Sequence, residues 1–497
     1  MSLADAREPA TEFIMKGIAM KHIIGVPIAA LLFVGALLAQ DSMAPNLGQP
    51  SSNGSSAELN AAQNPFLGGV PSGAKTGGIL PLSLSEAIKR GLTYNLGAIL
   101  GEQGAQAARG AKLLALSQLL PHFGAGAGDS LQQVSLKSFG FSGFPGLNTI
   151  VGPFNVLDVR ASASQTVLDF SALNLYRAES QNTKAAQLSH ENAKELVAYI
   201  CANLYLQALA SNSRIEASKA QVKTAQVLYD LAVDQKAAGV VAGIETLRAQ
   251  VELQAQQQRL IVVEDQFAKD KLALARAIGL PLGQEFALAD PMAFAPISLM
   301  SLDEAVQRAY KSRPDLQSAQ AKVQSAELTR KAAESTRLPV VNFNADYGII
   351  GPRPWDSHGT FTVAGVVKVP IFTGGAMKAR MVESDALLRQ RQAELEDMKG
   401  KIFYEIQNAF LDLKAASDRV QVAQSAIKLA NEQVSQSEDR FRTGVTNNVE
   451  VVQAQEALAT ASENLISSLH SLCAANLALA RALGISESEY EQFISGK

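Results

Sequence analysis

Arg440-Phe441-Arg442-Thr443-Gly444-Val445, followed by Val449-Glu450-Val451-Val452-Gln453-Ala454-Gln455, is a stretch that occurs twice in this chain. The other copy is Ala238-Gly239-Val240, followed by Ile244-Glu245-Thr246-Leu247-Arg248-Ala249-Gln250. Residues 203–279 align with residues 408–484 at a constant offset of 205, without a gap, and 22 of 77 positions are identical. The chain therefore carries an internal duplication.

A glycine lies at the centre of each copy. Gly239 and Gly444 interrupt long patterns rich in Ala, Gln, Leu and Glu, and the patterns resume at once. Such an interruption predicts a tight turn between two antiparallel helices. We therefore expect two long helical hairpins, with arms over residues 171–236, 245–278, 376–442 and 449–483. At 1.5 Å per residue, a first arm of more than sixty residues would be on the order of 90 Å long.

A strand pattern precedes each hairpin. Leu120-Pro121 recurs as Leu338-Pro339, and after the second pair apolar and polar residues alternate, as they do in a half-buried strand. The alternation predicts strands over 341–349 and 361–369 and, more weakly, over 123–134 and 156–168. Helices over 85–117 and 303–336 are expected before them.

The N-terminus resembles a secretory signal, because Met20-Lys21-His22 precedes the apolar run from Ile23 to Leu38. The run is short for a membrane anchor, which is the alternative. We expect an exported protein with a signal peptide (1–40), a flexible leader (41–81), repeat 1 (82–281), a linker (282–300), repeat 2 (301–485) and a C-terminal tail (486–497).

Composition argues against several functions. The formal net charge is −3, so a nucleic-acid partner is not expected. The two cysteines and five histidines are scattered without the spacing of a metal site or a nucleophile motif. We expect no enzyme activity, no cofactor and no metal.

The four strands need partners. Each has about the length that crosses a membrane, and strands in hydrocarbon satisfy their backbone only in a closed barrel, of which the smallest have about eight strands. Two, three or four chains would supply eight, twelve or sixteen strands, and long helices rising from them would form a continuous tube. The pattern indicates a conduit.

These features together resemble the TolC-like outer membrane efflux protein family: the duplication, the helix start Leu-Ser/Asp-Glu-Ala, the strands after proline, and the turn Thr443-Gly444-Val445 with Glu450 and Ala454-Gln455. The resemblance covers roughly residues 82–485. It implies a mixed α and β membrane protein, a homotrimer whose twelve-stranded barrel in outer membrane lipid is continuous with a periplasmic α-helical barrel.

The resemblance also implies roles for the hairpin tips. Ala238, Gly239, Val240, Thr443, Gly444 and Val445 would meet a periplasmic adaptor protein, which links the duct to an inner-membrane efflux transporter. Glu450 and Gln453 fall at the channel entrance, where Gln453 carries no charge. Phe441 and Glu245 fall where the family braces its closed state, and Phe441 lacks a hydroxyl for that bond. Alternatively, Glu450 is a solvated residue near a helix N-terminus.

We therefore expect a passive exit duct in the cell outer membrane, with a large periplasmic part, that serves a tripartite efflux or type I secretion system. Two alternatives remain, a periplasmic coiled-coil scaffold without a channel and a periplasmic enzyme. The alternating strands argue against the scaffold, and the lack of a polar catalytic cluster argues against the enzyme.

Overall fold

The computed structural model describes residues 64–140, 149–290, 300–443, 445–446 and 448–485, which all belong to one unit. The predicted signal peptide, residues 41–63 of the predicted leader, residues 291–299 of the linker, Gly444 and the predicted tail lie outside the described residues.

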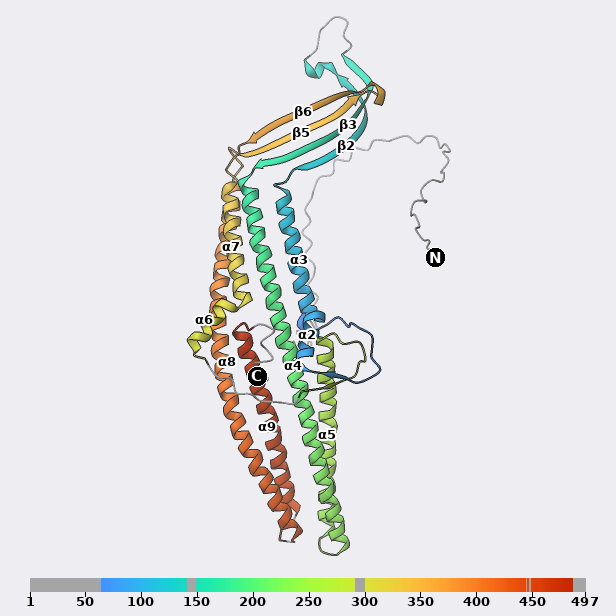
Figure 1. The fold of residues 1–497 in the computed structure, drawn as a ribbon, viewed down its shortest axis with the longest axis vertical. Coiled ribbons are helices and arrows are strands. Elements are labelled where there is room, and N and C mark those ends of the chain that lie inside the picture. Colours follow the sequence, from blue (N-terminus) through green and yellow to red (C-terminus); the bar gives the residue numbers. More distant parts are fainter. Residues whose placement is uncertain (1–63, 141–148, 291–299, 444, 447, 486–497) are drawn as a thin grey trace, which may run out of the picture. The chain divides into compact units, whose positions relative to one another are not determined.

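Two very long helices form the frame (Figure 1). They are α4 (Phe170–Ala237) and α8 (Ala376–Arg442), of 68 and 67 residues, and each would be about 100 Å long at 1.5 Å per residue. Each turns back into a helix of 35 residues, α5 (Gly243–Ala277) after α4 and α9 (Asn448–Ala482) after α8. The predicted helical hairpins are therefore present in the structure.

Each of the two shorter expected helices is a pair of helices. α2 (Leu84–Tyr94) and α3 (Leu96–Ser117) meet at Asn95, whose side chain accepts a hydrogen bond from the Gly97 amide and caps α3. α6 (Leu302–Ser312) and α7 (Pro314–Ser335) meet at Arg313, which is extended because a residue before proline avoids the helical region. The expectation of unbroken helices over 85–117 and 303–336 was wrong at these two positions.

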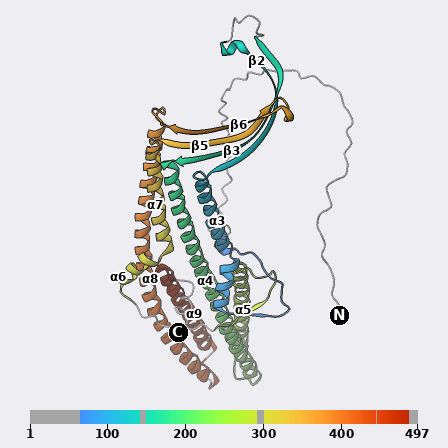
Figure 2. The same cartoon turned by 45° about the horizontal axis from the view of Figure 1, so that its top comes forward.

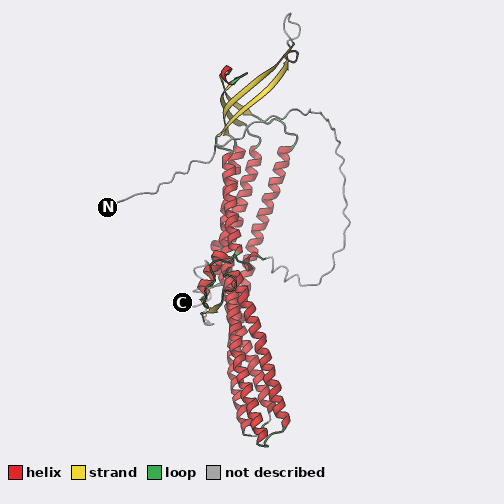
Figure 3. Ribbon diagram, turned by 90° about the vertical axis from the view of Figure 1, so that its right-hand side faces the viewer, coloured by secondary structure: helices red, strands yellow, loops and turns green. Residues whose placement is uncertain are grey.

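The helices form one layer whose composition changes along α4 (Figures 1 and 3). Along the first part of α4 the order is α3, α4, α7, α8, and along its second part the order is α5, α4, α9, α8. The short helices and the return arms thus occupy successive parts of the same layer. In the second part, α5 and α8 are its two edges.

Four antiparallel strands extend from the ends of the helices (Figure 2). Their order is β2 (His122–Ser135), β3 (Ile150–Leu168), β5 (Val340–Gly351) and β6 (His358–Lys368), so the pairing of β3 with β5 joins the two repeats. A second, two-stranded parallel sheet pairs β1 (Leu80–Leu82) with β4 (Phe286–Leu288). Three short 3-10 helices complete the described elements: η1 (Pro65–Leu67), η2 (Leu136–Phe139) and η3 (Pro354–Asp356).

The large sheet has one apolar and one polar face, as the alternation predicts. The apolar face carries exposed large side chains, among them Phe343, Tyr347, Phe361, Val363 and Val367. On the polar face Arg160 of β3 donates hydrogen bonds to Asp158, to Asp346 of β5 and to Thr360 of β6. This one guanidinium contacts side chains from three neighbouring strands.

The hydrophobic core lies where both repeats meet the small parallel sheet. Tyr205 of α4 is fully buried there, and its hydroxyl donates to the Leu82 carbonyl of β1. Residues of both repeats share this core, including Val197, Leu274, Ile402 and Leu477. No helix within the described ranges is sufficiently long and apolar to cross a membrane.

Candidate functional site

The tip of the first hairpin is a glycine turn. Gly239 has φ +72°, the left-handed region that favours glycine, and nothing lies within 4 Å of where its Cβ would be. The Val240 amide donates to the Gln235 carbonyl (2.9 Å) and the Gly239 amide to the Lys236 carbonyl (3.0 Å), which is the Schellman pattern that closes a helix. The backbone alone therefore fixes the turn, and Ala238 and Val240 remain exposed.

The tip of the second hairpin repeats this geometry. The Val445 amide donates to the Arg440 carbonyl (2.9 Å), the counterpart of the bond from Val240. The Thr443 hydroxyl also donates to the Asp439 carbonyl (2.9 Å), and Thr443 and Val445 are exposed. Gly444, between them, lies outside the described residues. Both tips thus present exposed side chains where hydrogen bonds close the ends of α4 and α8.

Glu450, in the first turn of α9, has partners within its own hairpin. The Thr446 hydroxyl donates to Glu450 Oε2, and Arg440 Nε lies 3.4 Å from Glu450 Oε1. More than half of the Arg440 side chain is exposed, so solvent screens this ion pair. Gln453, one turn further along the helix, is exposed.

Phe441 and Glu245 are held by separate contacts. Phe441 is buried in a small apolar cluster with Leu228 of α4 and Val451 of α9. Glu245 pairs with Arg248, with 2.7 Å between Oε1 and Nη1, and its buried Oε2 has no hydrogen-bond partner in the described chain. The aromatic ring at 441 therefore holds the two hairpins together by packing.

A buried ionic cluster, which the sequence analysis did not find, lies where α4, α7, α8 and α9 meet. Arg481 of α9 donates to Glu195 (2.8 Å) and to Asn192, both of α4. Arg313, almost fully buried, donates to Asp315 (2.6 and 3.0 Å) and to Glu405 of α8 (2.6 Å). Arg481 lies within the duplicated Leu-Ala-Arg-Ala motif, but the motif alone does not indicate its acceptor.

Burial dominates the electrostatics of this cluster. It raises the pKa of Glu195 to about 7, although the attraction of Arg481 acts against this rise. The pKa of Asp315 is lowered, because the hydrogen bonds from Arg313 outweigh the opposing effect of burial. The two carboxyl groups therefore differ in protonation near neutral pH.

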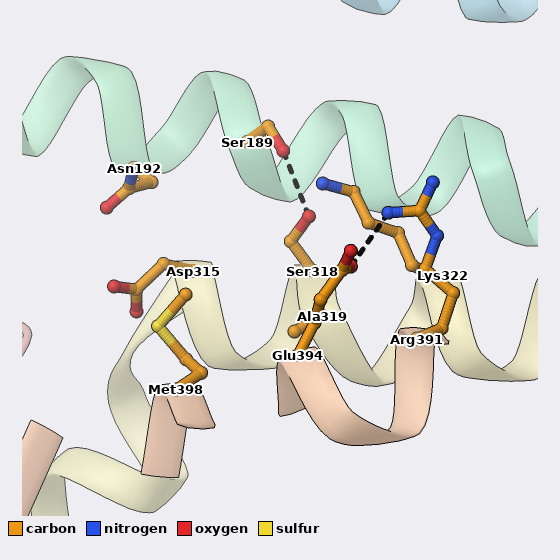
Figure 4. Close-up of a pocket in the computed structure, with 9 residues that line it drawn as sticks. All are labelled: Ser189, Asn192, Asp315, Ser318, Ala319, Lys322, Arg391, Glu394 and Met398. Atoms are coloured by element: carbon orange, nitrogen blue, oxygen red, sulfur yellow. Dashed lines mark hydrogen bonds and ion pairs between the residues drawn. The ribbon is translucent and has the colours of Figure 1, made fainter. Parts of the chain in front are cut away.

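A pocket adjoins this cluster (Figure 4). It is lined by side chains of α4, α7 and α8, and the Ser189 and Ser318 hydroxyls lie 2.9 Å apart across it. Arg391 pairs with Glu394 one turn along the same helix (2.7 Å). The complete lining is Ser189, Asn192, Asp315, Ser318, Ala319, Lys322, Arg391, Glu394 and Met398. Two pairs within this lining, Ser189 with Ser318 and Arg391 with Glu394, are thus already formed.

The described residues contain no group of His, Cys, Asp and Glu side chains that could hold a metal ion. Cys201 and Cys473 are buried free thiols, and burial raises the pKa of Cys201 to about 12. A thiol with so high a pKa is a poor nucleophile. Both cysteines are packing residues of the core.

The sequence profile of the outer membrane efflux protein family matches residues 101–280 and 305–485. These two segments are the two repeats, and together they cover more than half of the chain.

Comparison with individual outer membrane proteins is consistent with this match. The chain is 23% identical over 322 residues to the toluene efflux pump outer membrane protein TtgC of Pseudomonas putida, an alignment that covers 63% of this chain and 64% of that protein. It is 23% identical over 390 residues to the pyoverdine export outer membrane protein OpmQ of Pseudomonas aeruginosa, covering 76% and 80%. The crystal structure of the outer membrane protein VceC of Vibrio cholerae has the same fold, with a TM-score of 0.70, 16% identity and coverage of 81% and 96%.

Proposed function

The chain belongs to the outer membrane efflux protein family, and from this premise we propose that it is the outer membrane channel of a tripartite efflux or type I secretion system. In this proposal it is a passive exit duct, coupled through a periplasmic adaptor to an inner-membrane transporter. The family is one of transport channels, not of enzymes.

The four-stranded sheet is the observation that carries this proposal. Its strands are 11 to 19 residues long, and one face exposes large apolar side chains such as Phe343, Phe361 and Val363. In water such a face is unfavourable, whereas in a bilayer it is the surface that contacts lipid. The polar face with Arg160 would then line an aqueous lumen.

The open edges of the sheet and of the helix layer support assembly from several copies, and we propose three copies because the resemblance to the family implies a homotrimer. β2 and β6 each have one side without a neighbouring strand in the chain. A lipid-embedded sheet has no open edge, so copies must join β6 to β2, and three copies would give twelve strands. In the same way the edge helices α5 and α8 would close a helical barrel below the membrane.

The tips and the entrance complete the proposed duct. The exposed turns at Val240 and Val445 are candidates for adaptor contact, because they are shaped by backbone bonds and need no partner to form. Glu450 would stand at the entrance, and Gln453 next to it would add no charge. Phe441, packed against Leu228, would hold the closed arrangement from within each chain. Glu245 stays a bracing candidate through its Oε2, because its Oε1 pairs with Arg248 of the same helix.

The names of the relatives support a passive role. One relative is a toluene efflux protein and the other a pyoverdine export protein. Relatives named for different cargoes suit a duct whose selectivity lies in its partners. We extend this role to the present chain as part of the proposal.

Planar-bilayer recording from the purified full chain tests the proposal, together with export in a cell that lacks its own outer membrane channel. We expect stable single-channel currents and restored export of a dye when the matching adaptor and transporter are present. A protein that stays in the soluble fraction and carries no current would instead support the periplasmic scaffold.

A further inference from the structure

The two repeats meet along the seam between α4 and α9. Arg214 of α4 donates to both carboxylate oxygens of Glu463 of α9, at 2.9 to 3.0 Å. Nearer the tip, Leu228 of α4 packs with Val451 of α9 and with Phe441. An arginine–carboxylate pair and an apolar cluster therefore hold this seam.

The duplication supplies a counterpart for each side of the seam. At the offset of 205, α4 corresponds to α8, and α9 corresponds to α5. In this part of the layer, α4 has a neighbouring helix on each side, α5 and α9. α8 packs against α9 on one side, and α5 packs against α4 on one side. α4 packs against α9, but the corresponding pair, α8 and α5, does not pack together within the described part of one chain.

Leucines at equivalent positions of the two repeats differ in their exposed fraction. Leu206 of α4 is 3% exposed, whereas its counterpart Leu411 of α8 is 61% exposed. Leu477 of α9 is 0% exposed, whereas its counterpart Leu272 of α5 is 70% exposed. A leucine at the same repeat position is therefore buried in one repeat and exposed in the other.

The bare leucines belong to stripes with coiled-coil spacing. On α5, Val251 and Leu272 are separated by 21 residues, three heptads, and Gln258 and Asp265 lie on the same heptad position between them. On α8, Val422 and Leu429 are one heptad apart, and Arg419 lies one turn before Val422. Each stripe is exposed and combines apolar with polar side chains, as the seam between α4 and α9 does with Arg214 and Glu463.

We propose that α8 of one copy docks against α5 of a second copy in the register that the repeat prescribes, with Arg419 facing Gln258 where Arg214 faces Glu463 within the chain. This inference rests on the proposed channel, and it assigns the residue pairing of the seam between copies. Leu411 and Leu272 become buried in this seam.

The register gives the seam between copies a different chemistry from the seam within the chain. Gln258 is neutral, so Arg419, which forms no ion pair in the described chain, gains no carboxylate at that position. At the tip, Gln433 and Thr246 replace Leu228 and Val451. The seam between copies therefore lacks both the ion pair and the apolar cluster that hold the seam within the chain.

Cysteine crosslinking in membranes tests the register. In a background with Cys201→Ala and Cys473→Ala, the pair Arg419→Cys and Gln258→Cys is treated with a short bis-maleimide and analysed on denaturing gels. We expect covalent dimers and trimers, which neither single cysteine variant gives. The matched control pair Arg214→Cys and Glu463→Cys should react to the same extent but remain at the monomer position.

The outcomes separate the register from the channel itself. Absence of dimers and trimers, together with an intact control crosslink and normal single-channel current, overturns the register and leaves the channel proposal standing. Loss of current and of membrane association in the parent protein contradicts the channel proposal.

A charge-restoring variant tests the difference between the seams. Gln258→Glu recreates across copies the pair that Arg214 and Glu463 form within the chain, so trimer dissociation in detergent should shift to higher temperature. The shift should disappear when Arg419→Gln is combined with it. An equal shift with and without Arg419 would mean that the two side chains do not meet.

Discussion

Equivalent residues at the two tips have different interaction partners. Glu450 and Glu245 occupy the same repeat position, but Glu450 contacts Arg440, whereas Glu245 pairs with Arg248 in its own helix. The position of Gln453 three residues after Glu450 leaves that turn of α9 with one carboxylate. Arg440 therefore offsets part of the charge that Glu450 presents.

We predict that Arg440→Gln increases the cation preference of the channel and that Glu450→Gln reduces it. The reason is that Arg440 offsets part of the charge of Glu450 at a screened, partly exposed site. Reversal potentials in a salt gradient across a planar bilayer measure this preference. Gln453→Glu serves as the reference for one added carboxylate, and identical reversal potentials in all variants would return Glu450 to the role of a solvated helix residue.

We predict that Gly239→Ala and Gly279→Ala lower thermal stability by different amounts. Both glycines have positive φ, which costs alanine about 1 to 2 kcal/mol. Around Gly239 the space for a Cβ is open, whereas at Gly279 the Cβ would lie 2.6 Å from both the Tyr94 Cβ and the Val70 carbonyl oxygen. Unfolding midpoints by circular dichroism should therefore fall more for Gly279→Ala, and an equal fall would contradict the packing at that position.

At the scale of elements, the sequence predicts what periodicity and turn chemistry encode. The helical hairpins follow from a glycine within a continued helical pattern, and β5 and β6 follow from strict alternation such as Val341 to Ile349. The break at Asn95 was not predicted, because it is one residue inside an otherwise helical stretch. The break at Arg313 was missed although Pro314 signals it. The short strands β1 and β4 were not predicted, because three residues are too few to show an alternation of apolar and polar side chains.

The buried pairs also lie beyond sequence reasoning. Glu195 and Arg481 are 286 residues apart, and each alone resembles one of the many charged residues of a solvated helix face. Only the packing of α4 against α9 shows that they meet. Tip positions could be proposed from the repeat, whereas contacts between repeats required the structure.

The strands provide a matched pair of tests for the apolar face. Val363 lies on the exposed apolar face of β6, and Thr362 points to the other side. Val363→Lys should reduce insertion and trimer yield, because a lysine facing lipid costs about 2 to 4 kcal/mol near the middle of a bilayer. Thr362→Lys should be tolerated. Trimer yield is measured on gels run with and without heating of the sample, and equal trimer yields for the two variants would contradict the assigned lipid face.

At the scale of the whole molecule, three pairs of an arginine and a carboxylate among the described residues join the two repeats. Arg160 and Asp346 join them in the sheet, Arg481 and Glu195 at the core, and Arg214 and Glu463 below it. The core pair is the most buried of these helix contacts, and the raised pKa of Glu195 makes it sensitive to pH.

We predict that the stability contributed by Glu195 decreases as the pH rises through about 7. Its folded pKa lies above the ordinary value of 4.5, so the folded chain binds a proton more tightly than the unfolded chain between these values. The contribution is therefore complete below pH 4.5 and lost above 7. Thermal midpoints at about pH 5 and about pH 8 should differ less in Glu195→Gln than in the parent chain, and an unchanged difference would exclude this site as the cause.

The pairing of β3 with β5 has a genetic consequence. Because strand pairing, a shared core and the α4–α9 seam already join the two repeats, the peptide connection between Asp290 and Met300 contributes little to their association. A gene cut within that connection, with a second export signal added to the later half, should yield two polypeptides that find each other after translocation. Co-expression of the halves would then rebuild a working duct from split parts.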